Sequence, residues 1–127
     1  MSTATVVAEY FKLTNYWKKE KGEKIVVLYQ VGKFFEIYAL DEGDGNYSGS
    51  NMGEIHNITG LVIAKKSGQK YSNGKDIVMA GFQPPQLEKF VNMFQDYDYT
   101  SIIYTQDGTG KNTTRSLEEI ISPGTFF

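Results

Sequence analysis

The chain has 127 residues, of which 40% are hydrophobic and 14% aromatic, so it can bury the core of one compact domain rather than two. The absence of cysteine excludes disulfide bonds and thiolate metal sites. The opening MSTATVVAEYFKLTNYWKK has no apolar run of the length that a signal peptide or a membrane span requires. We therefore expect a single domain over residues 1–127 of an intracellular, non-secreted protein that contacts no membrane.

The net charge is −2, but the charges are unevenly distributed along the chain. Residues 1–40 contain six Lys and four Glu, and residues 61–81 contain four Lys and one Asp. By contrast, residues 41–60 carry four acids and no base, and residues 82–127 carry six acids and three bases. Two basic segments in an acidic chain give one basic face, suited to a nucleic acid, if the fold brings them together. Ordinary solvated lysines are the equally open alternative.

The first predicted element is an amphipathic helix, because one face of side chains recurs three and four positions apart. That face comprises Val6, Val7, Tyr10, Phe11, Thr14 and Trp17. Ser2 or Thr3 can cap the start of the helix, and Gly22 can close it. Two strands follow over residues 25–31 and 34–40, where β-branched and aromatic residues are enriched. Only two residues join them, which predicts a β-hairpin.

The second half of the chain predicts further strands, joined by polar loops and two helices. The strands are expected over residues 61–66, 76–82, 99–106 and 113–121. Residues 41–51 read as a Gly-rich loop, residues 52–58 as a short helix, and residues 67–75 as a flexible loop. Pro84-Pro85 starts a helix with an apolar face of Leu87, Phe90, Val91 and Phe94. The expected fold is α/β or α+β, with a mixed sheet of about six strands flanked by two or three helices.

Catalytic and metal-binding patterns are missing from the sequence. Nucleophilic catalysis needs an activated Ser, Cys or Lys beside a base, and the single histidine, His56, has no cysteine to pair with. Glu54 is not at a metal-ligand spacing from it, and Asp41, Glu42 and Asp44 lack the spacing of an EF-hand. The Gly-rich phosphate-binding loop, which ends in Gly-Lys-Ser or Gly-Lys-Thr, is also absent. We therefore expect no enzymatic activity and no cofactor or metal site in this domain.

The most informative segment is VGKFFEIY, residues 31–38. Strand alternation places Phe35 and Ile37 toward a core, and Phe34 and Glu36 together on the outward face just after a turn. An exposed ring beside a carboxylate suits a protein that pushes the ring between base steps and hydrogen-bonds the loosened base. Stacking of a ring on a base contributes roughly 1–3 kcal/mol, and unstacking a base step costs a few kcal/mol. A mispaired step costs less to open than a paired one, so such a ring selects mismatches through the deformability of the duplex. From the residues alone, the favoured alternative is that both aromatic side chains pack in the core and Glu36 lies on the surface.

At this segment the sequence resembles a known family. GKFFEIY is similar to the glycine-x-Phe-x-Glu motif of the MutS mismatch-recognition domain. The resemblance continues in order through EYFKLTNYW, AKKSG, VMAGFQ, QLEKFVNMF and ISPGT, so it covers nearly the whole chain. YQVGKFFEIY together with MAGF looks closest to the MutS branch of giant DNA viruses and octocoral mitochondria. The resemblance implies a domain that recognises mismatches in double-stranded DNA.

The resemblance also implies roles for individual residues. Phe34 matches the ring that stacks on a mispaired base from the minor groove, and Glu36 the carboxylate that hydrogen-bonds that base. Met79 belongs to a mainly structural segment beneath the DNA-facing loops, and Lys33 raises the positive potential beside the ring in place of the commoner acid. Phosphate contacts are expected from Lys65, Lys66, Lys70 and Lys75. The candidate DNA-binding residues are therefore Phe34, Glu36, Lys33, Lys65, Lys66, Lys70, Lys75 and Met79.

By the same resemblance, the chain is expected to be a fragment of a longer protein. The other domains of a MutS-like parent would supply the clamp, the dimer interface and an ATPase that uses ATP and Mg²⁺. The terminal Phe126-Phe127 pair fits a chain that continues. A cytoplasmic, nuclear, virus-associated or mitochondrial location is compatible with this interpretation. The open alternative is a freestanding MutS-like module with a structural or protein-interaction role, for example in a virus particle.

Overall fold

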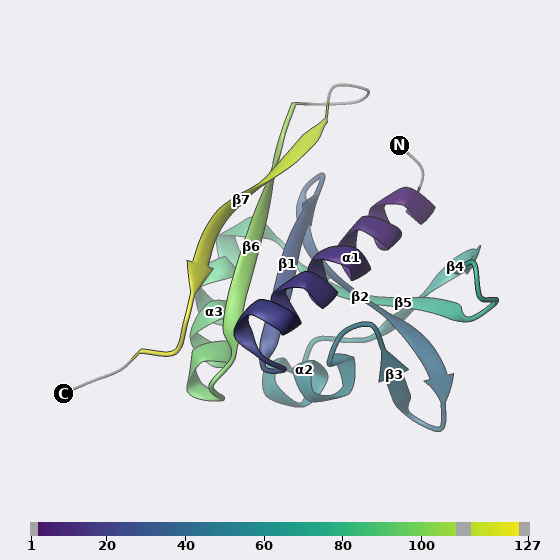
Figure 1. Ribbon diagram of the computed structural model, residues 1–127, viewed down its shortest axis with the longest axis horizontal. Helices are drawn as coiled ribbons and strands as arrows, with labels where there is room; N and C mark the ends of the chain where they lie inside the picture. The colour runs from purple at the N-terminus through teal and green to yellow at the C-terminus, as the bar shows by residue number, and fades with distance from the viewer. Residues whose placement is uncertain (1–2, 109–112, 125–127) are drawn as a thin grey trace.

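A computed structural model describes residues 3–108 and 113–124 of the protein. Within these residues the chain forms three α-helices, one short 3₁₀ helix and a single seven-stranded mixed sheet (Figure 1). The elements are α1 (Thr3–Lys21), β1 (Ile25–Val31), β2 (Phe34–Gly43), β3 (Asn46–Ser48), α2 (Met52–Thr59), β4 (Ala64–Lys70), β5 (Asp76–Phe82), the 3₁₀ turn Pro84–Gln86, α3 (Leu87–Asp96), β6 (Thr100–Asp107) and β7 (Thr114–Ile121). The predicted α+β class is confirmed.

The sheet has the strand order β4-β5-β2-β1-β6-β7, with β3 paired to β2. β1 and β2 form the predicted antiparallel hairpin, in which Val31 lies opposite Phe34. β1 and β6 are parallel, and the chain between them carries α2 and α3. Parallel neighbours need such a long connection, whereas antiparallel neighbours such as β6 and β7 need only a turn. In this strand order the β1–β2 hairpin occupies the middle of the sheet.

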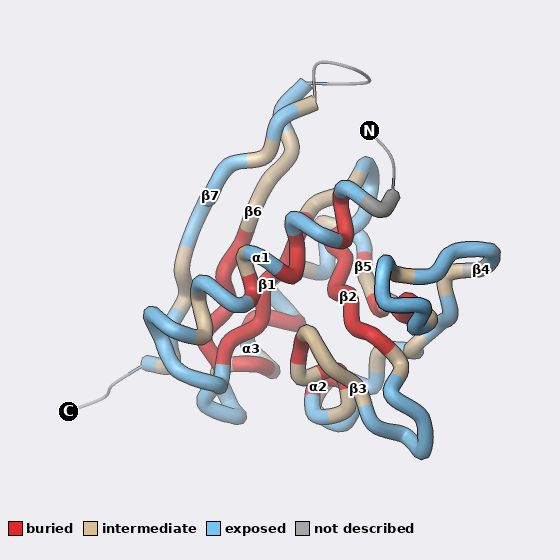
Figure 2. The backbone as a smooth tube through the Cα atoms, turned by 45° about the vertical axis from the view of Figure 1, so that its right-hand side comes forward, coloured by how far each residue is buried: buried red, intermediate tan, exposed pale blue. Residues whose placement is uncertain are grey.

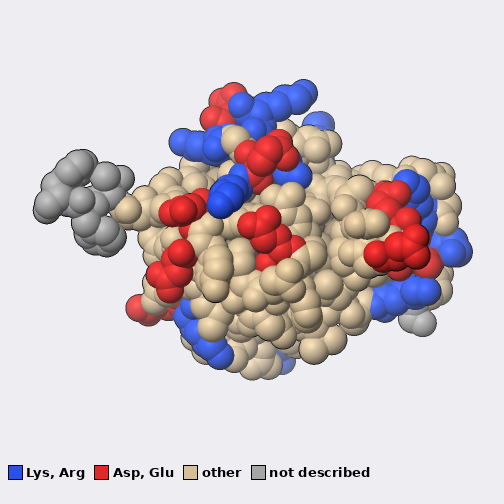
Figure 3. Space-filling view, turned by 90° about the horizontal axis from the view of Figure 1, so that it is seen from below, with Lys and Arg blue, Asp and Glu red and all other residues tan. Residues whose placement is uncertain are grey.

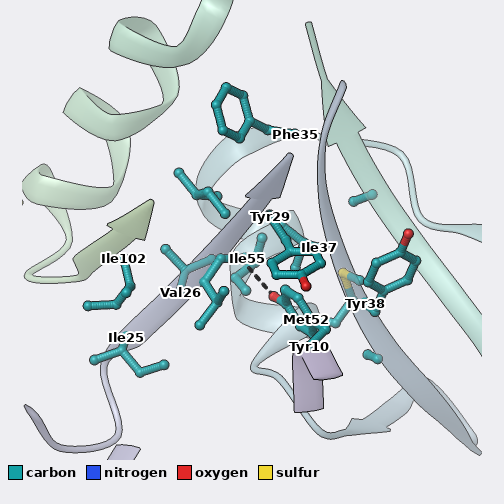
Figure 4. Packing of buried hydrophobic residues seen from close by; sticks show 14 of the residues in the cluster. Tyr10, Ile25, Val26, Tyr29, Phe35, Ile37, Tyr38, Met52, Ile55 and Ile102 are labelled. Atoms are coloured by element: carbon teal, nitrogen blue, oxygen red, sulfur yellow. Dashed lines mark hydrogen bonds between the residues drawn. The ribbon is translucent and has the colours of Figure 1, made fainter. Parts of the chain in front are cut away.

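Helices cover both faces of the central strands, which explains why β1 and β2 are buried almost throughout (Figures 1 and 2). On one face, the Tyr10 ring of α1 lies edge-on to the rings of Tyr29 and Tyr38. On the other face, the Phe82 ring lies between those of Phe35 and Phe90, the latter on α3. Figure 4 shows the packing around Tyr10, whose hydroxyl donates a hydrogen bond to the Val27 carbonyl oxygen at 2.8 Å. The face under α1 is called the α1 face below.

Two local expectations differ from the structure. The segment expected as a loop over residues 41–51 contains the end of β2 and all of β3, joined by a tight turn in which Asp44 and Gly45 both have positive φ, 55° and 77°. The Asp-Gly pair is a signal for such a hairpin turn. The strand expected over residues 61–66 instead runs over Ala64–Lys70, because it pairs with β5 despite its polar composition.

The ends of the helices follow the expected chemistry. α1 stops at Gly22, which has a φ of 93° and donates its N–H to the Lys18 carbonyl oxygen. α3 follows a 3₁₀ turn that begins at the predicted Pro84, and it buries Phe90, Val91 and Phe94. The proposed Ser2 cap and the Phe126-Phe127 pair lie outside the described residues. Among the helices that the structure describes, none combines the length and the apolar character needed to cross a membrane.

Candidate nucleic-acid interface

Phe34 lies at the start of β2, immediately after the Gly32-Lys33 turn. Its side chain is 45% exposed, whereas Phe35 beside it is 3% exposed. Strand alternation predicts this contrast, because adjacent residues point to opposite faces. Gly32 has a φ of 61°, a conformation that the tight turn requires and that glycine adopts without strain. The predicted exposed ring and buried neighbour are therefore confirmed.

The turn that presents Phe34 is linked to β6 and β7 by side-chain hydrogen bonds. The Gly32 N–H donates to Oε1 of Gln106 at 2.7 Å, and the Gln106 N–H donates to Oε1 of Gln30 at 2.8 Å. Arg115 of β7 donates from Nε to the Gln30 carbonyl oxygen at 2.6 Å. Its guanidinium group also lies 4.9 Å from the centre of the Tyr29 ring. These contacts hold the exposed ring on a fixed support, which lowers the entropy cost of using it for binding.

Glu36 does not point into solvent as expected. Its side chain is 8% exposed, and Oε1 accepts a hydrogen bond from the Tyr38 hydroxyl. Alternation correctly gives Phe34 and Glu36 the same face, but α1 covers that face beyond Phe34 through the packing of Tyr10 on Tyr38. Burial, followed by the hydrogen bond to Glu36 and its charge, raises the pKa of Tyr38 well above its ordinary value. The hydroxyl therefore stays protonated and remains a donor to the carboxylate throughout the physiological pH range.

Lys66 and Met79 lie on the same face as Glu36 and Tyr38. Met79 is directly opposite Tyr38 in the β2–β5 pair. The half-buried Lys66 places Nζ 3.8 Å from the Met79 sulfur and 5.9 Å from the centre of the Tyr38 ring. The structure thus brings Glu36, Lys66 and Met79 together on the α1 face, with Phe34 at its exposed margin.

Lys33 is exposed on the turn, whereas three other predicted lysines are exposed but form ion pairs within the domain. Lys65 and Lys70 lie 3.0 and 2.7 Å from the carboxylate of Asp76, and Lys75 pairs with Glu42. Hydrogen bonds from Lys70 and then Lys65 hold the pKa of Asp76 below its ordinary value. Exposed pairs of this kind contribute little stability, and salt screens them. The lysines therefore add less positive potential than their number suggests, and Figure 3 shows acidic and basic side chains interspersed on the face it views.

Gly81 allows β5 to approach β2 closely at Glu36, its partner in the sheet. A Cβ added at Gly81 would lie 2.8 Å from the Phe35 carbonyl oxygen, so the backbone must shift to accept it. We expect Gly81→Ala to lower the free energy of unfolding by about 1–3 kcal/mol, the usual cost of overpacking.

Gly53 offers a matched control for this prediction. It lies inside α2, and the nearest atom to an added Cβ there is 3.9 Å away. Gly53→Ala should therefore stabilise the chain slightly, because alanine favours a helix. Urea unfolding of the two variants compares them, and equal stability for both would contradict the close approach at Gly81.

The single histidine has a local structural contact. His56 is exposed on α2, and its Nδ1 lies 2.7 Å from the Leu61 carbonyl oxygen. A carbonyl oxygen only accepts, so Nδ1 carries the proton in this bond. No group of three or more His, Cys, Asp or Glu side chains suited to a metal ion is found in the part of the chain that the structure describes.

Sequence reasoning missed three residues that shape the candidate site: Tyr38, Gln106 and Arg115. The first had a local signal, because residues two apart on a strand share a face and Tyr38 follows Glu36 at that distance. Gln106 and Arg115 lie 74 and 85 residues from their partners in the hairpin, so no local pattern could find them.

Comparisons with known proteins give a consistent result. The family model described as MutS domain I matches residues 11–127. The chain is also 23% identical, over 124 residues, to a protein of Acanthamoeba polyphaga mimivirus described as a putative DNA mismatch repair protein and mutS homolog. That match covers 96% of this chain and 11% of the viral protein, so the chain spans about a tenth of its relative's length.

Proposed function

Because the chain belongs to the MutS domain I family, a non-catalytic DNA-binding domain of mismatch-repair proteins, we propose that it recognises mispaired bases by inserting Phe34 into the duplex from the minor groove. The observation that carries this proposal is the 45% exposure of Phe34 on a turn that Gln106 and Arg115 brace. Exposed rings are common on protein surfaces, but the ring of Phe34 is also held on a braced turn, which suits it to insertion between bases. A base pair that is already weakened is the partner that the ring can separate most cheaply.

Glu36 has a different role from the ring in this proposal. Its carboxylate lies along the same face of β2 as Phe34, but toward the core. A base that remains stacked in the duplex does not reach so recessed a group, whereas a base displaced by Phe34 approaches it. A carboxylate near DNA also repels phosphates, so it favours discrimination over affinity.

The lysines supply the backbone contacts in the proposed complex. Lys33 is adjacent to Phe34 on the exposed turn, and Lys66 lies beside Met79 on the same face. Lys65, Lys70 and Lys75 would reach phosphates only by exchanging their present acidic partners. Met79 acts by supporting Lys66 and Tyr38 rather than by touching DNA.

The remaining functions of a MutS-like protein would come from outside this chain. We propose a longer parent whose other domains form the dimer and hydrolyse ATP with Mg²⁺, in keeping with the share of the viral relative that the chain spans. The pairing of Lys65, Lys70 and Lys75 with acids favours a second candidate function, a structural or protein-interaction module, for example in a virus particle. Binding to DNA separates the two.

We expect the 127-residue chain alone to bind DNA weakly and with little preference for a mismatch. Among the lysines assigned to DNA, only Lys33 and Lys66 have no acidic partner within the described residues, and two further lysines share the single charge of Asp76. Few counterions are then released, and the logarithm of the binding constant should fall with the logarithm of salt concentration with a slope of roughly −3.

Titration of the ¹⁵N-labelled chain with a mismatched duplex at two salt concentrations tests both the affinity and the surface. The amide shifts should concentrate at residues 31–36, around Lys66 and at the bracing residues Gln106 and Arg115, and should spare α3. Nanomolar affinity at physiological salt would contradict the expected weakness. Shifts confined to α3, or no binding at low salt, would overturn the proposed DNA-reading surface and favour the structural module.

A further inference from the structure

The buried side chains of Tyr38 and Glu36 satisfy each other through one hydrogen bond. Both residues are buried, and the Tyr38 hydroxyl donates to only one carboxylate oxygen, Oε1 of Glu36. A carboxylate has two oxygens that accept hydrogen bonds, so occupying one of them fixes the rotation of the group and orients the other. The Tyr38 ring is itself held in place, edge-on to Tyr10 at 5.4 Å.

The aliphatic part of the Glu36 side chain is also confined. Gly81 is its partner on β5, and a Cβ added there would lie 3.7 Å from Cγ of Glu36. The methylene groups therefore rest near the bare backbone of β5 while Tyr38 holds the carboxylate. Side chains that act at a recognition site need this kind of support, because a misplaced group loses most of its selectivity.

We propose that Tyr38 is a specificity-determining positioning residue, whose hydroxyl orients the carboxylate of Glu36 toward the base that Phe34 displaces. This inference rests on the proposed function of Phe34 and Glu36, and it adds a residue that touches no DNA. Tyr38 acts through Glu36: it holds Oε1, which leaves Oε2 as the acceptor for a base N–H. Without the hydroxyl, the carboxylate rotates between several orientations and recognises the displaced base less well.

Tyr38→Phe tests the proposal, because it deletes the hydroxyl and keeps the ring that packs on Tyr10. The matched control is Tyr10→Phe, which deletes a buried hydroxyl in the same cluster that donates to the Val27 carbonyl oxygen instead. Two measurements are made on each variant. The first is the ¹³C chemical shift of the Glu36 carboxyl carbon in the 127-residue chain. The second is the competition between mismatched and matched duplexes for the protein at its native length.

We expect Tyr38→Phe to shift the Glu36 carboxyl signal and to lower mismatch preference roughly two- to tenfold, the range of one hydrogen bond. Affinity for matched duplex should not change, and Tyr10→Phe should leave both the signal and the preference as in the wild type. If the wild-type protein prefers mismatched duplex and the Tyr38→Phe variant keeps that preference in full, the positioning role of Tyr38 is wrong and the proposed function is unaffected. A wild-type protein with no preference would instead overturn the proposed function, and this inference with it.

Discussion

Phe34→Ala will abolish the preference for mismatched over paired duplex and leave the thermal stability of the protein nearly unchanged. The ring is 45% exposed, so its loss opens no cavity in the core. On DNA the same change removes one stacking contact, worth roughly 1–3 kcal/mol or about a five- to 150-fold loss of affinity for the mismatch. Affinity for paired duplex depends mainly on phosphate contacts and should fall little.

Competition between mismatched and matched oligonucleotides, with the protein at its native length, measures the change. Tyr97→Ala is the control, because Tyr97 is another exposed aromatic, 56% accessible, but lies at the end of α3. It removes a ring of similar size from a surface that the proposal does not use. If Tyr97→Ala lowers the preference as much as Phe34→Ala does, or if Phe34→Ala unfolds the domain, the role assigned to Phe34 is wrong.

The neighbouring substitution should behave in the opposite way. Phe35→Ala is expected to lower the free energy of unfolding by about 3–5 kcal/mol, the usual cost of truncating a buried phenylalanine. Phe35 is 3% exposed, and its ring centroid lies 5.8 Å from that of Phe82, which in turn contacts Phe90 of α3. The cavity would therefore open between the sheet and α3, where two layers of the fold meet.

Thermal and urea unfolding of the purified chain measure this effect. A loss of that size corresponds to a fall in melting temperature of roughly 10–20 °C for a domain of this length. Phe35→Leu, which keeps most of the apolar volume, should recover much of the loss. A Phe35→Ala variant that melts with the wild type would show that the β2 register differs from the one described.

The two variants also explain why the hairpin could be predicted from the sequence. Residues 25–40 consist of β-branched and aromatic runs on either side of Gly32-Lys33, and alternation then assigns Phe34 and Phe35 to opposite faces. Alternation gives the face of a side chain but not what covers that face. For this reason the sequence predicts an exposed Glu36, whereas α1 covers it through Tyr10 and Tyr38.

The polar segments were harder to predict than the apolar ones. β3 has only three residues and β4 contains Lys, Ser, Gly and Gln, so neither has the composition of a strand. Both form because a partner strand is already in place, which is a tertiary effect that overrides local preference. The lysines show the same limit, because Lys75 pairs with Glu42, 33 residues away, and only the fold brings the two together.

A photochemical crosslink tests the central claim, the insertion of Phe34 at a mispaired base, most directly. A duplex carries 5-iodouracil in place of a thymine mispaired with guanine, and irradiation joins that base to an aromatic side chain stacked upon it. Peptide mass spectrometry should place the crosslink on Phe34, with far less product from the same base paired to adenine and none from Phe34→Ala. A crosslink that maps to another aromatic, such as Tyr16 or Tyr97, or that forms equally with the paired duplex, would contradict the account.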